Sequence, residues 1–376
     1  MSKYAFGDIA INSTEKRTPT EADMETYIGL EHLDAGSLTI KRWGSKVPIK
    51  GDKTVMRKGD VLFGKRNAYL RRAAVCPHDG LFSAHGMVLR PKTEVIDRDF
   101  FPLFIASDYF FDAAIRISVG SLSPTVNWSD LKKLEFSLPP LDEQRKLAQV
   151  LWSVIELKEA YQKLLTRCDE MASSRFIELF GEKQYPKFTL IELIEPDAGL
   201  SYGIVQPGDD GTGDMGVLRP VDLVDGRIST SNIKYVNRNI GDGYKRTELN
   251  GKEILISVRG TTGLTAITDS RFIGMNVTRG IAVIRFDERK VNSIFLNSAL
   301  NELGSQAFIQ EHTRGATLKQ INLTDLRRLP ISLPPLALQN EFAAFIEELD
   351  KSKVELQKSI ASLEVLMKTL SQDISN

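Results

Sequence analysis

"FSLPPLDEQ", at residues 136–144, returns almost letter for letter as "ISLPPLALQ" at residues 331–339. The two stretches lie 195 positions apart in a chain of 376 residues. Each places a pair of prolines before a helix-forming run, which is polar in the first copy, and proline is well tolerated in the first turn of a helix. The repeat therefore predicts two helices that begin at equivalent points of a duplicated chain.

The duplication extends upstream of these helix starts. "VGSLSPTVNWSDLKKLEFSLPPL" (119–141) aligns without gaps on "RGATLKQINLTDLRRLPISLPPL" (314–336). Further upstream the offset drifts, where "GDVLFGKRN" (59–67) pairs with "KEILISVRG" (252–260). This combination predicts, in each copy, a variable globular module joined to a more constrained segment.

Each module combines strand-like and helix-like segments. "DVLFG", "HGMVLRP", "EILISV" and "GIAVIRF" are short apolar runs, rich in β-branched residues and bounded by glycine, proline or charge. Such runs are typical of strands. A helix is expected after them in each copy, at 97–117 and at 292–312. The fold class predicted for each copy is therefore α+β.

A long helix is expected to close each copy. From Leu141 to Phe180 the chain contains no proline or glycine, and Gly181 then provides a stop. In both helices the apolar residues follow alternating steps of four and three, which is a heptad seam. The first seam contains Leu147, Leu151, Val154, Lys158, Tyr161 and Leu165, and the second contains Phe342, Ile346, Leu349, Lys353, Leu356 and Ile360.

Two arrangements fit these seams. Each helix could pack only on its own module, or the two could pair as an antiparallel coiled coil in which Lys158 and Lys353 select the register. A helix of roughly 40 residues is about 60 Å long at about 1.5 Å per residue. Antiparallel pairing would give the chain pseudo-twofold symmetry, as in dimers that read two half-sites on a DNA duplex.

Composition excludes several classes of protein. The 49 basic and 49 acidic residues cancel, which argues against non-specific coating of DNA. Two cysteines and four scattered histidines offer neither a disulfide framework nor a metal-binding spacing. No signal-like or membrane-spanning apolar stretch is visible, so we expect a cytoplasmic protein without a metal or a bound cofactor.

The tandem modules, the two "LPPL" helix starts and the heptad seams together resemble the specificity subunit of a Type I restriction–modification system. "LPPLDEQ" follows the family pattern closely, whereas "LPPLALQ" departs from it by placing Leu338 where an acidic residue usually stands. The resemblance implies four segments. These are a first target-recognition domain (1–139), a first spacer helix (140–181), a second target-recognition domain (182–334) and a second spacer helix (335–376).

The resemblance also implies the function. The chain is not expected to be an enzyme itself. It is expected to be the subunit that reads a bipartite, interrupted and asymmetric site on double-stranded DNA. Two modification subunits are the expected partners, and they would transfer methyl groups from S-adenosylmethionine to adenine. A motor–nuclease subunit is a further partner that the resemblance allows.

Local charge points to candidate DNA-binding loops. From Lys41 to Arg72 the chain has eleven lysines and arginines against two aspartates. One candidate loop follows a predicted strand in each copy (64–72 and 257–264), and a second lies at the start of each constrained segment (118–127 and 312–322). The candidate DNA-binding residues are Lys65, Arg66, Asn67, Tyr69, Arg71, Arg72, Arg259, Thr261, Thr262, Arg314, Lys319 and Gln320. The alternative for any one of them is an ordinary solvated surface residue.

A different class of function fits the same outline. The chain could be a protein-binding coiled-coil adaptor whose end modules read peptides. The basic run from Lys41 to Arg72 favours DNA instead, because lysine and arginine neutralise phosphates.

Overall fold

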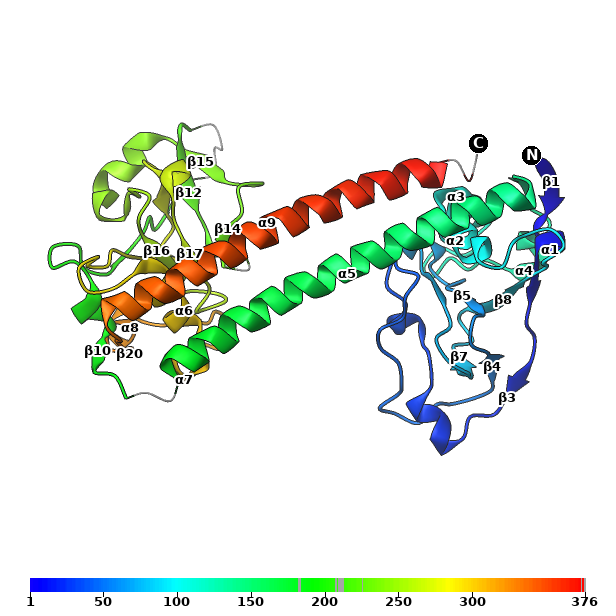
Figure 1. Ribbon diagram of the computed structural model, residues 1–376, viewed down its shortest axis with the longest axis horizontal. Helices are drawn as coiled ribbons and strands as arrows, with labels where there is room; N and C mark the ends of the chain where they lie inside the picture. The colour runs from blue at the N-terminus through cyan, green and yellow to red at the C-terminus, as the bar shows by residue number, and fades with distance from the viewer. Residues whose placement is uncertain (182–183, 207, 209–212, 225, 373, 375–376) are drawn as a thin grey trace. The chain divides into compact units, whose positions relative to one another are not determined.

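The computed structural model describes residues 1–181, 184–206, 208, 213–224, 226–372 and 374. The chain forms two compact units, of which unit 1 comprises Met1–Leu164 with Leu356–Asn376 and unit 2 comprises Leu165–Glu355. Each unit contains one globular module and parts of both long helices, α5 (Leu141–Phe180) and α9 (Leu336–Gln372). Figure 1 draws α5 in green and α9 in orange to red. The predicted segment limits at 182 and 376 lie outside the described residues, and the four-segment division remains a proposal.

Unit 1 is built on a four-stranded antiparallel sheet of order β2-β8-β5-β6. Its strands are β2 (Ala10–Asn12), β8 (Met87–Pro91), β5 (Val61–Phe63) and β6 (Ala73–Val75). A second sheet has the order β3-β4-β7, from β3 (Lys16–Arg17), β4 (Lys53–Met56) and β7 (Gly80–Phe82). The terminal strand β1 (Ser2–Ala5) pairs with β9 (Glu135–Leu138), directly before α5.

Unit 2 repeats this plan with a four-stranded sheet of order β11-β19-β16-β17. Its strands are β11 (Ser201–Tyr202), β19 (Ile281–Ile284), β16 (Ile254–Ser257) and β17 (Thr265–Ile267). The second sheet has the order β15-β12-β18, from β15 (Lys234–Val236), β12 (Met215–Leu218) and β18 (Asn276–Val277). Two further pairs join β13 (Leu223–Val224) to β14 (Arg227–Ile228), and β10 (Lys187–Thr189) to β20 (Pro330–Ser332). The four predicted strands are confirmed as β5, β8, β16 and β19.

The prediction of a single helix after the strands of each copy is wrong, because each predicted range contains two helices. In unit 1, α2 (Phe100–Ala106) and α3 (Asp108–Arg116) are separated by Ser107, whose backbone is extended and whose Oγ accepts a hydrogen bond from Phe110 N at 3.2 Å. In unit 2, α6 (Ser293–Asn301) and α7 (Leu303–His312) are separated by the extended residue Glu302. Short helices α1 (Phe6–Ile9), α4 (Trp128–Leu131) and α8 (Leu323–Arg327) complete the modules.

The module core of each unit continues onto the long helices. In unit 1 the rings of Phe6, Phe104, Phe110 and Phe136 cluster, with Phe6 and Phe110 centroids 5.1 Å apart. Leu151 of α5 joins this core and is 2% exposed. In unit 2 the ring of Phe180 lies 5.0 Å from that of Phe295 and 5.6 Å from that of Phe342. Continuous apolar packing therefore holds each module on the helices of its unit.

Within each unit α5 and α9 pair antiparallel. Lys158 Nζ lies 2.8 Å from Glu364 Oε1 in unit 1. In unit 2, Lys353 Nζ lies 2.5 Å from Asp169 Oδ1, and Arg175 Nη2 lies 2.6 Å from Glu341 Oε1. The twelve predicted seam residues, from Leu147 to Leu165 and from Phe342 to Ile360, are all buried or half-buried. The predicted α+β fold with paired long helices is confirmed, while the pairing role of each single residue stays a prediction.

Candidate nucleic-acid interface

The two candidate loops of unit 1 lie against each other. Asn67 N donates a hydrogen bond to Pro124 O at 2.7 Å, and Val126 N donates to Lys65 O at 2.9 Å. Arg66 and Thr125 form an antiparallel bridge between these bonds. Segments that are almost 60 residues apart in the sequence thus form one surface beyond the end of β5.

Unit 2 builds its pair of loops with the same backbone bonds. Gly260 N donates to Lys319 O at 2.8 Å, and Ile321 N donates to Val258 O at 3.0 Å. Arg259 and Gln320 form the bridge between them. The structure therefore brings the candidate loops together twice, in equivalent places of the two modules.

A glycine closes the second loop in each unit. Gly120 has φ +116° beside the Val119–Thr125 bridge, and Gly315 has φ +109° beside the Arg314–Gln320 bridge. These backbone conformations are unfavourable for any residue with a side chain. A Cβ on Gly315 would also lie 2.2 Å from Leu318 O. The loop shape thus depends on glycine.

Both first loops turn through the left-handed region at matching positions. Asn67 has φ +55° and its counterpart Gly260 has φ +82°. The Oδ1 atom of Asn67 and the Nε atom of Arg259 are buried without a hydrogen-bond partner among the described residues. Buried polar atoms are normally satisfied. Each loop consequently retains hydrogen-bonding capacity at a site predicted to contact DNA.

Several candidate side chains face solvent around these loops. Arg66 is exposed and its Nη2 donates to Ser123 Oγ at 3.0 Å. Tyr69 is 55% exposed. Arg314, Lys319 and Thr261 are exposed in unit 2, where Gln320 is half-buried. Arg314 Nη2 lies 3.9 Å from Asp325 Oδ2, a long contact at a largely exposed side chain.

Other candidate residues are occupied within the module. Arg71 lies 2.6 Å from Asp108 Oδ1 and 2.5 Å from Asp112 Oδ1, so its guanidinium joins the loop to α3. Arg72 Nη1 donates to Leu30 O at 3.3 Å. Thr262 is 6% exposed, and its hydroxyl lies 3.0 Å from that of Thr313. The geometry gives these three residues a role in holding the loops.

Sequence reasoning missed a cavity of about 280 Å³ beside the first loop. Besides Lys65 it is lined by Lys16 of β3, Thr54 of β4 and Asn127 of the second loop. In the sequence, the polar residues that line this cavity lie in several separate segments. No regular spacing links these segments, so the sequence does not indicate that they meet.

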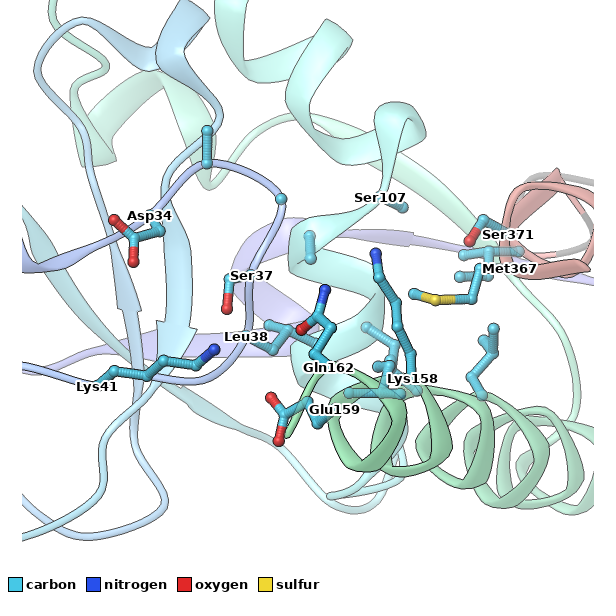
Figure 2. A pocket seen from close by; sticks show the side chains of 17 residues that line it. Asp34, Ser37, Leu38, Lys41, Ser107, Lys158, Glu159, Gln162, Met367 and Ser371 are labelled. Atoms are coloured by element: carbon cyan, nitrogen blue, oxygen red, sulfur yellow. The ribbon is translucent and has the colours of Figure 1, made fainter. Parts of the chain in front are cut away.

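A second hollow of unit 1, of about 380 Å³, lies between the turn at 34–38 and the paired helices (Figure 2). Figure 2 shows Lys158 of α5 beside Met367 of α9, and Glu159 of α5 on the side of the turn residue Ser37. The Lys158 ammonium in this wall is paired with Glu364. This hollow belongs to the junction of module and helices, and no candidate DNA-binding residue lines it.

The described residues contain no group of side chains arranged to hold a metal ion. Cys76 and Cys168 are free thiols. Among the helices of the described chain, none combines the length and apolar character needed to cross a membrane.

Comparison with known proteins supplies the family. Residues 4–167 and 213–364 match the family described as the Type I restriction modification DNA specificity domain, which confirms the predicted internal repeat. The chain is 24% identical over 289 residues to the Type I restriction enzyme EcoBI specificity subunit of Escherichia coli, covering 69% of this chain and 61% of that subunit. It is 25% identical over 364 residues to the putative type I restriction enzyme MjaX specificity subunit of Methanocaldococcus jannaschii, covering 88% of this chain and 83% of that subunit.

Solved structures show the same fold. The crystal structure of a Type I restriction–modification S subunit from M. genitalium matches with a TM-score of 0.62 and 13% identity, covering 100% of this chain and 96% of that chain. A chain from a structure of complex assembly and conformational transition in the type I R-M system matches with a TM-score of 0.52 and 20% identity, covering 99% of this chain and 96% of that chain. Both curated relatives are named specificity subunits, in agreement with the family that the sequence resembles.

Proposed function

Because the chain belongs to the family of Type I restriction–modification DNA specificity domains, we propose that it reads a bipartite, interrupted DNA site with its two modules. The observation that carries this proposal is the repeated pair of loops, which presents Arg66 from unit 1 and Arg314 with Lys319 from unit 2. Arginine can bind guanine through two hydrogen bonds, and lysine neutralises phosphates.

The two half-sites should differ in sequence. The loops share their backbone hydrogen bonds, but the side chains at equivalent positions differ: Lys65 matches Val258, and Asn67 matches Gly260. In the second loops Val119 matches Arg314. Base reading depends on side-chain donors and acceptors. A common backbone with different side chains therefore supports an asymmetric site.

We further propose that modification subunits bind along the paired helices. Unit 1 has a hollow of about 460 Å³ beside them, lined by Leu147 and Val150 of α5 and by Leu370 of α9. Unit 2 has one of about 750 Å³, lined by Met171 of α5 and by Phe345 of α9.

These two hollows overlap in the internal repeat, since Val150 matches Phe345 and Leu370 matches Arg175. Val150 is 47% exposed and Met171 is 51% exposed. Exposed apolar side chains in both hollows, at positions that overlap in the repeat, favour two copies of one partner. That partner would be the adenine methyltransferase subunit, which uses S-adenosylmethionine, with a motor–nuclease subunit as an additional member.

The compartment we propose is the cytoplasm. Thiols stay reduced there, and both cysteines of this chain are free. Burial raises the pKa of the Cys76 thiol to about 12, which makes that thiol unreactive. The alternative of a peptide-reading coiled-coil adaptor is not favoured, because the matched relatives are specificity subunits.

A module exchange tests the proposed function. The full chain would be expressed with its methyltransferase subunit, and N6-methyladenine would be mapped across the genome. Replacing residues 1–139 with the matching module of another specificity subunit should change one half of the methylated motif and leave the other half intact. A change in both halves, or in neither, would contradict independent reading by two modules.

A further inference from the structure

The cavity beside the first loop of unit 1 is rich in hydrogen-bond donors. It lies where β3, β4 and the two candidate loops meet. The polar residues that line it include Asn12, Thr14, Lys16, Thr54, Lys65 and Asn127. Lys16 and Thr54 are direct partners across the β3–β4 pair, so the sheet itself fixes one wall. The ring of Trp128, which packs against Phe6, forms another.

The charge of this cavity is uncompensated. Two ammonium groups, of Lys16 and Lys65, contribute to the lining, and no carboxylate does. Neither ammonium forms an ion pair within the part of the chain that the structure describes, whereas the neighbouring Arg17 is paired with Asp23 at 2.6 Å. Burial lowers the pKa of the Lys65 ammonium, and the positive charge of Lys16 adds to this effect. An unpaired, half-buried cation costs folding free energy.

The fold does not require a lysine at this position. Val258 is the counterpart of Lys65 in unit 2, because the backbone carbonyl of each accepts the equivalent hydrogen bond, from Ile321 N at 3.0 Å and Val126 N at 2.9 Å. Val258 is 0% exposed and belongs to the apolar core of unit 2. The same backbone is thus built with an apolar side chain in the second module. The cost of Lys65 must be offset by something other than folding.

We propose that this cavity is an anion site that receives one backbone phosphate of bound DNA, held by Lys65 and Lys16. The inference rests on the proposed function and assigns a chemical class to one part of the interface. The lining supplies ammonium, hydroxyl and amide donors around a space that a phosphate oxygen can enter. Lysine binds phosphate as a point charge, and such contacts fix the register of a protein on the duplex without reading its sequence.

The test compares Lys65→Met with a matched lysine variant, Lys58→Met. Lys58 precedes β5 and Lys65 follows it, so both belong to unit 1 but lie at opposite ends of one strand. The full chain with its methyltransferase subunits would be titrated with a target duplex and an unrelated duplex at several salt concentrations. Loss of one phosphate contact should reduce the slope of log affinity against log salt by about 0.9.

In the expected result, Lys65→Met weakens binding to both duplexes by the same factor and lowers the slope, while Lys58→Met changes neither. Lys65→Arg, which keeps the charge, should retain the slope. Loss of affinity for the target duplex alone would overturn the proposal, because Lys65 would then read a base. An unchanged slope in Lys65→Met would also overturn it.

Free phosphate is the other source of the same chemistry. Inorganic phosphate would be added to the wild-type chain and to Lys65→Met at matched ionic strength, with the thermal midpoint as the readout. If phosphate stabilises the wild type alone but the DNA slope is unaffected by the variant, the cavity binds free phosphate and the assignment to DNA is wrong.

Two further controls separate the possible failures. Lys65→Val copies the residue of unit 2 and should fold with an unfolding midpoint no lower than that of the wild type. A wild-type complex that binds DNA without steep salt dependence would contradict the proposed function itself. If the affinity of the wild-type complex falls steeply with salt and Lys65→Met shows the same slope, only the inference about the cavity is contradicted.

Discussion

Gln144 and Gln339 make the same three hydrogen bonds, each within its own unit. Gln144 Nε2 donates to Pro139 O at 2.8 Å and to Val95 O at 3.2 Å, and its Oε1 accepts from Asp97 N at 2.8 Å. Gln339 Nε2 donates to Pro334 O at 2.8 Å and to Lys290 O at 3.2 Å, and its Oε1 accepts from Asn292 N at 2.9 Å. The glutamines are 1% and 0% exposed.

This pair explains why the "LPPL" stretch is repeated together with its glutamine. Each side chain fastens the first turn of a long helix to the segment that leads into the module's helices. Glu143, the acidic residue that precedes Gln144 in the first copy, is exposed and has no such role. Its counterpart Leu338 packs against the core of unit 2. The departure at Leu338 therefore adds apolar packing and leaves the glutamine clamp intact.

Replacing either glutamine by alanine should destabilise its unit strongly. Gln144→Ala leaves one backbone N–H and two carbonyls without their partner, and each buried unsatisfied group costs roughly 1–3 kcal/mol. We expect a loss of about 3 kcal/mol in the free energy of unfolding, measured by urea denaturation, for Gln144→Ala and for Gln339→Ala alike. Glu143→Ala is the matched control and should change little. A large loss in only one glutamine variant would contradict the equivalence of the two clamps.

The long helices and their seam could be predicted because their signal is local and periodic. Steps of four and three from Leu147 onward place one side of α5 toward α9, and this regularity needs no knowledge of the rest of the fold. The strands β5, β8, β16 and β19 were similarly visible as apolar runs between glycine, proline and charge. In these segments the local preference and the tertiary fold agree.

Other features depend on contacts that sequence spacing does not encode. The break at Ser107 requires one extended residue inside an apolar, helix-like run, with no proline or glycine next to it to signal the break. Each candidate loop is recognisable by itself in the sequence, but the bridge between Arg66 and Thr125 arises from the sheet topology. Lys16 reaches the cavity beside Lys65 because β3 pairs with β4. Arg71, which looked like a DNA contact by its charge, is paired with Asp108 and Asp112.

The seam lysines should stabilise the antiparallel register through their partners. Lys158 pairs with Glu364 in unit 1, and the equivalent Lys353 pairs with Asp169 in unit 2. Lys158→Glu should lower the urea midpoint by placing like charges together, and the double variant Lys158→Glu with Glu364→Lys should recover it. Because these side chains are partly exposed, a coupling energy of about 0.5 kcal/mol is expected, and it should shrink at high salt. Additive effects of the two substitutions would show that the pair contributes nothing.

The loop glycines should be essential to DNA binding in their own half of the site. Gly315→Ala forces a Cβ to within 2.2 Å of Leu318 O at a backbone φ of +109°. We expect the loop of unit 2 to be distorted and affinity for the second half-site to fall, measured with duplexes altered in one half at a time.

Gly304→Ala is the control for this glycine. Gly304 lies within α7, and a Cβ there would have no heavy atom within 4 Å. This variant should bind DNA normally and gain roughly 0.5–1 kcal/mol of stability, because alanine favours helix. Equal DNA affinity for both glycine variants would show that the loop shape is irrelevant to binding.

Acid should weaken unit 1 through Asp23. The carboxylate accepts two hydrogen bonds from Arg17, at 2.6 and 2.5 Å, and two from Thr20. The Arg17 guanidinium holds the pKa of Asp23 well below its ordinary value. A depressed pKa gives stability that is present above the unfolded pKa of about 3.9 and is lost as pH falls below it. The Asp23→Asn variant should therefore have a lower urea midpoint than the wild type at pH 7. Its urea midpoint should also fall less than that of the wild type on acidification. Parallel loss in both proteins would contradict this role.

The exposed apolar residues of the helix hollows should decide how many modification subunits bind. A carboxylate introduced at Val150 or Phe345 would have to be buried without a partner when a subunit docks, which is strongly unfavourable. Neither substitution should affect folding much, since Val150 is 47% exposed and Phe345 is half-buried. Native mass spectrometry of the complex should find two methyltransferase subunits on the wild type and one on Val150→Glu or Phe345→Glu.

The double variant should carry no methyltransferase subunit. Gln149→Glu adds the same charge beside Val150 on α5, at an exposed residue that does not line the hollow, and should still carry two. Loss of both subunits from a single variant would mean that they bind only as a pair. Two copies of one partner are expected because matched positions, Val150 and Phe345, present apolar contacts in the two hollows. Retention of both subunits in the double variant would therefore place the partner surface elsewhere on the chain.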